Sequence, residues 1–255
     1  HYVFIDGTFS ITPKGFSQVL VIMGQTNKMN LPLAYLLLPN KLQSTYEKAF
    51  IMLKGELNKS MFRAGTTFIS DMERGLYNAI KNALIGPEHY FQFCYFHFTQ
   101  AMKRHFDKYP KTKLMEELNY IANLLPFISE KRVIEVIGEL EQFNEAREFT
   151  KYFEDYYITR YPFQDWSVYT KPEKETITNN VAESHNNLLS RVIGQHPSLK
   201  EFETKIEELE KNYYRRYSYQ TFTEPTISRI DEQTFDIKYK KLIADFRRAQ
   251  RTHHQ

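Results

Sequence analysis

The stretch Tyr2-Val-Phe-Ile-Asp-Gly-Thr-Phe9 begins with an apolar run and places an acidic residue, Asp6, directly after it. A continuous apolar run, unlike strict alternation, is typical of a strand that is buried on both faces beneath helices. Two similar runs follow, at Gln18–Met23 and Leu33–Leu38. The opening of the chain therefore predicts an α/β fold whose first strand is followed by an acidic side chain.

The pattern then alternates between helix and strand. Residues 44–59 and 72–84 have helical spacing, and Thr66–Ile69 and Tyr90–Phe93 are short strand-like runs. Five strands with helices between them favour a mixed, open sheet over a barrel or a sandwich.

The strand signal ends after Phe96. Amphipathic helices are expected over Lys113–Leu125, Glu130–Phe143 and Glu145–Tyr157, before an irregular stretch, Arg160–Thr178. Further helices are expected over Asn180–Ile193, Leu199–Tyr217 and Ile237–Gln250, the second with a capping box of Ser198 and Glu201.

The composition excludes several classes of protein. The 255 residues are 42% hydrophobic and 25% charged, which is globular usage and not that of a disordered chain. A single cysteine excludes an internal disulfide framework and a four-cysteine zinc module. A net charge of +3 permits a nucleic-acid partner without requiring one.

The chain begins at His1, inside a strand-like run, and shows neither a signal-peptide pattern nor an apolar stretch near the roughly 20 residues of a membrane span. We therefore expect a domain of a longer protein, with no membrane partner.

Three acidic residues occupy informative positions: Asp6 and Asp71 follow expected strands, and Glu183 lies near the start of an expected helix. Ligands gather at strand ends in open sheets, and hard divalent cations prefer oxygen ligands. Two such ions can stabilise the attacking and leaving oxygens of a phosphoryl displacement.

Each acid also has a purely structural interpretation. Asp6-Gly7 is a good hairpin turn. Ser70 and Glu73 form a capping-box pattern that leaves Asp71 in a first helical turn, and Asn180 with Glu183 forms another. The spacing alone does not decide between these readings.

The sequence motifs around these three acids resemble those of the catalytic domain of Mutator-like element (MULE) transposases. The blocks that carry the resemblance occur in the family's order from about Tyr2 to Leu188: Asp6-Gly-Thr-Phe9, Pro32-Leu-Ala-Tyr-Leu-Leu-Leu38 followed by Tyr46, Ser70-Asp-Met-Glu73, Cys94-Tyr-Phe-His97 with Gln100 and Arg104, Trp166-Ser-Val-Tyr169, and Thr178-Asn-Asn-Val-Ala-Glu-Ser-His-Asn-Asn-Leu188.

The resemblance implies a ribonuclease H-like fold and a DDE triad of Asp6, Asp71 and Glu183, which would also hold two Mg²⁺ or Mn²⁺ ions. It further implies a helical insertion before the last catalytic helix. The expected organisation is a first core part over 1–97, the insertion over 98–165, the catalytic-helix part over 166–220 and a basic segment over 221–255.

Four further residues belong to these blocks. Cys94 and His97 have a zinc-like spacing but no second pair, so zinc is not expected within these residues. Cys94 is expected to be structural, and His97 either structural, a phosphate contact or an orienting group. Asn179 and Asn180 precede Glu183 by four and three residues, and either cap the helix or orient the glutamate or a phosphate.

The implied function is metal-dependent cleavage and strand transfer of DNA, with element ends and target DNA as partners, a homo-oligomer as an option and a nuclear location for the parent protein. The alternative is a domesticated DNA-binding regulator without cleavage. Weak, sequence-independent binding is expected through basic residues at Lys103, Arg104, Arg215, Arg216, Lys240, Lys241, Arg247 and Arg248.

Overall fold

The computed structural model describes residues 1–26, 29–56, 62–171, 176–216 and 230–252, which divide between two compact units. Unit 1 contains His1–Cys94 and the segment that begins at Thr178 and carries α8 (Asn180–Ile193) and α9 (Leu199–Arg216). Unit 2 contains Tyr95–Ile177 and α10 (Glu232–Thr252).

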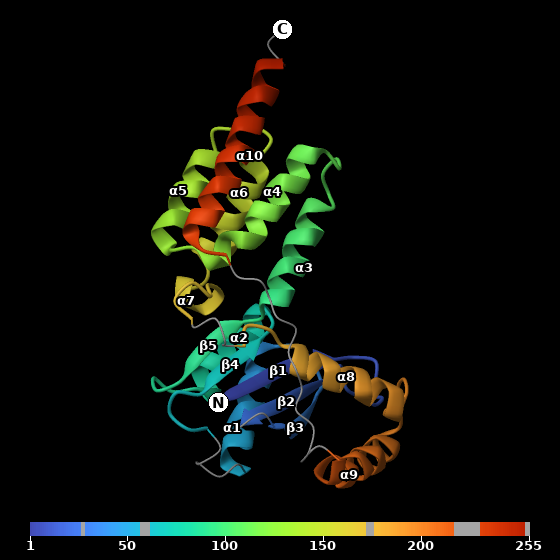
Figure 1. Ribbon diagram of the computed structural model, residues 1–255. Helices are drawn as coiled ribbons and strands as arrows, with labels where there is room; N and C mark the ends of the chain where they lie inside the picture. The colour runs from blue at the N-terminus through green and yellow to red at the C-terminus, as the bar shows by residue number, and fades with distance from the viewer. Residues whose placement is uncertain (27–28, 57–61, 172–175, 217–229, 253–255) are drawn as a thin grey trace. The chain divides into compact units, whose positions relative to one another are not determined.

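A mixed five-stranded sheet forms the centre of unit 1 (Figure 1). The strand order is β3-β2-β1-β4-β5; β1, β2 and β3 pair antiparallel, whereas β4 pairs parallel with both β1 and β5. This order is the ribonuclease H-like topology, so the predicted fold class is confirmed. The strands are β1 Tyr2–Thr8, β2 Gln18–Thr26, β3 Met29–Leu38, β4 Thr67–Ser70 and β5 Tyr90–Phe93.

Helix α8 covers one face of this sheet, where it contacts β1 and β2 (Figure 1). Side chains alternate between the two faces of a strand, so Phe4 and Asp6 of β1 point toward the same side. Phe4 indeed packs in a buried cluster with side chains of β2, β4, α8 and α9, including Val21, Ile69, Leu189 and Phe202.

The opposite face carries α1 (Gln43–Glu56), α2 (Arg74–Ala79) and η2 (Ile80–Leu84), a turn of π-helix that continues α2. Tyr46 and Phe50 of α1 are fully buried, and the ring of Tyr77 lies 5.1 Å from the rings of both Phe91 and Phe93. Burial on both faces explains why the strands are continuously apolar.

Unit 2 is helical and has its own core. Its elements are α3 Tyr95–Phe106, α4 Lys113–Leu124, η3 Leu125–Phe127, α5 Glu130–Leu140, α6 Arg147–Phe153, η4 Glu154–Ile158, α7 Phe163–Trp166 and α10. The rings of Phe98 and Tyr157 lie 5.0 Å apart, and those of Phe143 and Phe246 lie 4.9 Å apart. Much of the chain's aromatic content therefore fills this core.

Several local features differ from the sequence-based expectation, among them the following three. Helix α3 was not predicted, because the closely spaced aromatic residues Tyr95, Phe96 and Phe98 at its start obscure a helical stripe. The helix expected over Glu145–Tyr157 begins at Arg147 and widens into a π-helical turn after Phe153. The stretch Arg160–Thr178, expected to be irregular, contains the short helix α7.

A helix that crosses a bilayer needs about 20 predominantly apolar residues. Within the ranges that the structure describes, no helix combines the length and the apolarity needed to cross a membrane.

Candidate functional site

Asp6 lies within β1 and not after it. The strand continues to Thr8, with Asp6 opposite Val21 and Gly7 opposite Leu20 of β2, so the hairpin-turn interpretation of Asp6-Gly7 is wrong. A Cβ at Gly7 would lie 2.9 Å from Oε1 of Gln18, so glycine fits here because of a close approach and not because of a turn. The Asp6 side chain is 6% exposed.

Asp71 follows the last residue of β4 at the matching level of the neighbouring strand. The parallel register pairs Phe4 with Ile69 and Ile5 with Ser70, so Asp6 and Asp71 each come directly after the last of these paired residues. The two aspartates present carboxylate oxygens within 4.8 Å of each other. The structure therefore brings together two acids that are far apart in the sequence.

The capping box expected at Ser70 and Glu73 does not form. Ser70 is the last residue of β4, and α2 begins only at Arg74, where Glu73 makes no side-chain cap. Glu73 instead accepts a hydrogen bond of 2.8 Å from the Tyr46 hydroxyl. Asp71 therefore does not lie in a helical turn, and the dipole interpretation of this acid is wrong.

The start of α8 is bound to the sheet through Asn179. Asn179 occupies the N-cap position without a side-chain cap bond, so the capping interpretation is wrong for it, and Asn180 is already the first helical residue. The Asn179 side chain donates to the carbonyl of Ile5 (3.2 Å), and its backbone N–H donates to Sγ of the buried Cys94 (3.1 Å).

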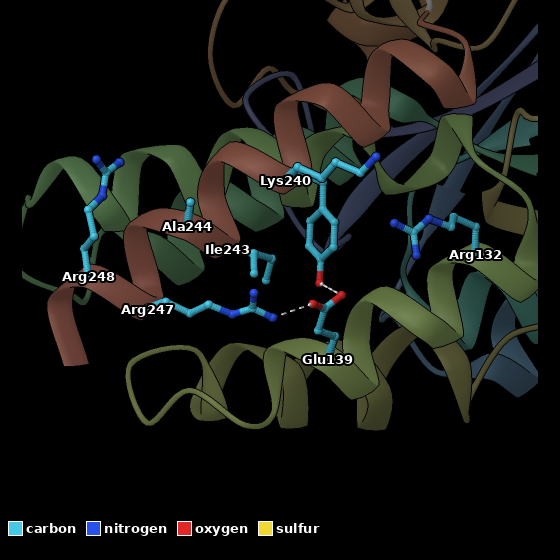
Figure 2. Close-up of a pocket in the computed structure, with 8 residues that line it drawn as sticks. Arg132, Glu139, Lys240, Ile243, Ala244, Arg247 and Arg248 are labelled. Atoms are coloured by element: carbon cyan, nitrogen blue, oxygen red, sulfur yellow. Dashed lines mark hydrogen bonds and ion pairs between the residues drawn. The ribbon is translucent and has the colours of Figure 1, made fainter. Parts of the chain in front are cut away.

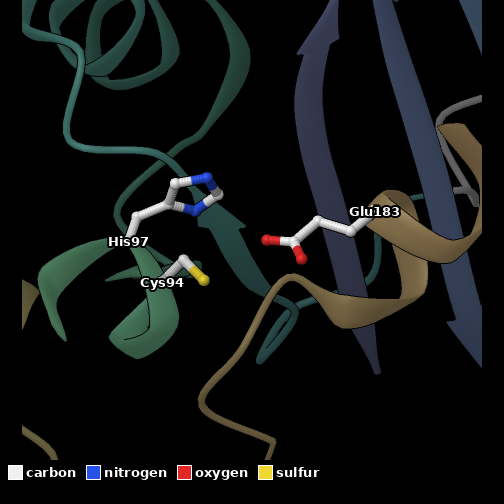
Figure 3. Close-up of side chains that lie close together, drawn as sticks. All are labelled: Cys94, His97 and Glu183. Atoms are coloured by element: carbon white, nitrogen blue, oxygen red, sulfur yellow. The ribbon is translucent and has the colours of Figure 1, made fainter. Parts of the chain in front are cut away.

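Glu183 lies in the first turn of α8 and is half-buried. Its carboxylate presents an oxygen within 4.8 Å of Sγ of Cys94, and Figure 3 shows the side chain extending from the helix toward Cys94. His97, also drawn in Figure 3, is in the first turn of α3 and so belongs to unit 2. In the part of the chain that the structure describes, Asp6, Asp71 and Glu183 do not form one group within 4.8 Å.

Asn186 connects α8 to the first aspartate. Its Nδ2 donates a hydrogen bond of 2.6 Å to Oδ2 of Asp6, and both side chains are buried. Sequence analysis missed this residue, although it lies three positions after Glu183, a spacing that brings two side chains to the same side of a helix.

His185 faces the sheet from the same helix. Nε2 lies 2.7 Å from the hydroxyl of Tyr35 on β3, and the two rings are stacked. Burial lowers the pKa of His185 to about 4, so the ring is neutral near pH 7.

The predicted DNA-binding residues lie in both units. Lys103 and Arg104 are exposed on α3, whereas the side chains of Arg215 and Arg216 lie outside the described part of the chain. In α10, Lys241 pairs with Glu117 (3.3 Å), Arg247 with Glu139 (3.7 Å), and Arg248 with Asp245.

Arg247, Glu139 and Arg248, which take part in these ion pairs, also line an open pocket of about 630 Å³ in unit 2 (Figure 2). Three arginines that line the pocket form ion pairs with acidic side chains: Arg132 pairs with Asp236 (2.8 Å), and Arg247 and Arg248 form the pairs given above. The pocket is therefore not a concentrated positive surface. It is lined by Arg132, Glu139, Tyr239, Lys240, Ile243, Ala244, Arg247 and Arg248.

Comparison with protein families relates unit 1 to a known domain. Residues 2–101 match the MULE transposase domain, which confirms the resemblance over that stretch. The match includes Asp6 and Asp71 and ends before Glu183. The choice of Glu183 as the third acid therefore rests on its position in α8 and not on the family match. No curated protein sequence matches the chain.

Proposed function

We propose that this chain is the catalytic domain of a DNA transposase, which cuts a DNA strand and joins the released 3′ end to a target. The observation that carries the proposal is the pair of aspartates at matching levels of β1 and β4, with carboxylate oxygens within 4.8 Å, inside the stretch that matches the MULE transposase domain. DNA as partner and a nuclear location of the parent protein are part of the same proposal.

The proposed reaction has two displacements at phosphorus. In the first, a water oxygen bonds to phosphorus while the bond to the 3′ oxygen breaks, and this oxygen leaves as a hydroxyl group. In the second, that hydroxyl oxygen bonds to a target phosphorus, and the target's own 3′ oxygen leaves.

The donor set fits a hard divalent cation. Asp6 and Asp71 supply carboxylate oxygens, which Mg²⁺ and Mn²⁺ prefer, and Glu183 would complete a second site. When bound, two such ions stabilise charge on the attacking and leaving oxygens.

The chain's own groups have separate tasks in this proposal. The paired strands β1 and β4 fix the spacing of Asp6 and Asp71, because both acids extend from the same parallel register. Glu183, on α8, would orient the nucleophile for attack. Burial of Asp6 keeps water away from part of its carboxylate and so strengthens its electrostatic interactions.

The test is nicking of supercoiled plasmid DNA by the wild-type chain, with and without Mn²⁺. Asp71→Asn should reduce metal-dependent nicking to background, because the amide is a neutral and poorer ligand of nearly the same size. The matched control is Asp107→Asn, which changes an exposed aspartate of α3's C-terminal end and should leave nicking unchanged.

Two outcomes would contradict the proposal. Nicking by Asp71→Asn at the wild-type rate would remove this residue from the chemistry. DNA binding by the wild-type chain without any metal-dependent nicking would instead favour the domesticated, non-cleaving regulator.

A further inference from the structure

Helix α8 is bound to β1 on both sides of Glu183. Asn179, four residues before Glu183, donates from its side chain to the carbonyl of Ile5 (3.2 Å). Asn186, three residues after it, donates to Oδ2 of the next residue along the strand, Asp6 (2.6 Å). Since a helix turns once in 3.6 residues, these offsets place both amides on the side of the helix that carries Glu183.

Both hydrogen bonds are formed between buried groups, so water does not replace a lost partner. Asn179 is 0% exposed, Asn186 8% and Asp6 6%. A hydrogen bond to an ionised carboxylate is stronger than one between neutral groups, and a buried acceptor that loses its donor is not rehydrated.

The chemistry of the donor is also informative. An amide orients a carboxylate without cancelling its charge, whereas a lysine or arginine at this position would compete with a cation for Asp6. The structure therefore supports Asp6 with a neutral donor from the helix that carries the third acid.

A second set of contacts fixes the beginning of α8. The backbone N–H of Asn179 donates to Sγ of Cys94 (3.1 Å), and the N–H of Cys94 donates to the carbonyl of Ser70 (2.9 Å). Ser70 directly precedes Asp71, so the start of α8 is connected to both strands that carry the aspartates.

We infer that Asn179 and Asn186 are positioning residues: they fix α8 to β1 so that Glu183 has a defined place relative to Asp6, and Asn186 also orients the Asp6 carboxylate. This inference rests on the proposed function, since it assigns the two asparagines a role in that site. Cys94 serves the same arrangement as the acceptor at the start of α8.

The test compares Asn186→Ala with Asn187→Ala. Asn187 is the next residue of the same helix and is exposed, so the control makes the same substitution about 100° further around the helix, at a side chain in solvent. Binding of Mn²⁺ to the protein alone, measured by calorimetry, should weaken on the order of 10-fold in Asn186→Ala, the usual effect of removing a group that orients a metal ligand. Asn187→Ala should bind Mn²⁺ as the wild type does.

Activity gives a second, separable readout. In Asn186→Ala, nicking should need more Mn²⁺ for half-maximal rate and should recover when Mn²⁺ is raised, because the Asp6 carboxylate is still present. A general loss of structure would not be corrected by metal. Circular dichroism verifies the fold, and Asn186→Ser, whose hydroxyl is too short to replace the amide, repeats the test if the alanine variant does not fold.

Hydrogen exchange of the α8 amides separates this inference from the proposed function. Exchange should accelerate over Asn180–Ile193 in Asn179→Ala and in Asn186→Ala, but not in Asn187→Ala. If the wild type binds no Mn²⁺, the metal site of the proposed function fails while exchange still tests the attachment of α8. Unchanged exchange and unchanged Mn²⁺ affinity in Asn186→Ala would each overturn the inference.

Discussion

Tyr46 of α1 is the central member of a polar chain that begins at the buried Gln18 and ends at partly exposed side chains. Its hydroxyl accepts a hydrogen bond of 2.5 Å from Nε2 of Gln18 and donates one of 2.8 Å to Oε1 of Glu73. Lys41 pairs with the other oxygen of Glu73 at 3.5 Å. Burial raises the pKa of Tyr46 well above its ordinary value, with Glu73 adding to the rise, so the hydroxyl keeps its proton for this contact.

Removing that hydroxyl should destabilise unit 1. Tyr46→Phe leaves the Gln18 amide, 1% exposed, without this acceptor. The expected loss is about 1–3 kcal/mol in the free energy of unfolding, the usual cost of a buried polar group without its partner. Urea unfolding followed by circular dichroism measures it.

The control for this change is Tyr169→Phe, at a tyrosine that is 45% exposed and should change stability little. Equal unfolding midpoints for Tyr46→Phe and the wild type would show that the polar chain does not contribute to stability.

At the scale of elements, α10 shows how a basic segment can be structural. It contacts α4, and its apolar residues Phe235, Tyr239, Leu242 and Phe246 are buried. Three of its predicted DNA-binding cations pair with acids of unit 2. The neighbouring Lys240 is exposed, and no ion pair of Lys240 occurs among the described residues.

This difference predicts unequal effects of two adjacent lysines on DNA binding. Lys240→Gln should lower the affinity for duplex DNA and reduce the slope of log affinity against log salt by about 0.9, the contribution of one phosphate contact. Lys241→Gln is the matched control, because Lys241 already pairs with Glu117 at 3.3 Å. A salt titration of binding to a labelled duplex gives both slopes; equal slopes in all three proteins would remove Lys240 from the DNA-binding set.

At the scale of the whole molecule, each unit has its own core, and the core of unit 2 contains a buried histidine that makes its stability depend on pH. His105 in unit 2 is 9% exposed, and its ring stacks on Tyr152 at 4.1 Å. Burial is the largest cause that lowers the pKa of His105; Lys108 lowers it further, and Glu148 opposes the shift.

The sign of the resulting pH dependence follows from proton uptake. The unfolded chain protonates this histidine near its ordinary pKa of about 6.5, while the folded chain does so only at lower pH. Stability is therefore fully present above about pH 6.5 and is lost as the pH falls below that value. His105→Gln should make the loss between pH 7 and pH 5 smaller.

The only tryptophan, Trp166, is buried in unit 2, so its fluorescence reports on the unfolding of this unit. The control is His196→Asn, at an exposed histidine whose positive φ of 48° suits asparagine. If His105→Gln and the wild type lose the same stability between pH 7 and pH 5, burial of His105 is not a source of the dependence.

The sequence by itself determined the elements of unit 1. Five apolar runs predicted five strands, and the expected bounds of the last strand, Tyr90–Phe93, and of α8 agree with the structure. The order of these strands and helices along the chain was also predicted correctly. So was the capping box in which Ser198 and Glu201 bond reciprocally. These features depend on neighbouring residues, whose periodicity and local hydrogen bonds are written directly in the sequence.

Only the tertiary structure decided what the local patterns left open. Asp6-Gly7 reads equally well as a turn, Ser70 with Glu73 as a capping box, and Asn179 as a helix cap, because each pattern is short. The pairing of β1 with β2, the bond from Tyr46 to Glu73 and the bond from Asn179 to the carbonyl of Ile5 exclude or replace these readings. The bond from Asn186 to Asp6 adds a contact that none of the patterns predicted. Such contacts join residues up to 180 positions apart, and no local pattern encodes which distant groups will satisfy a buried side chain.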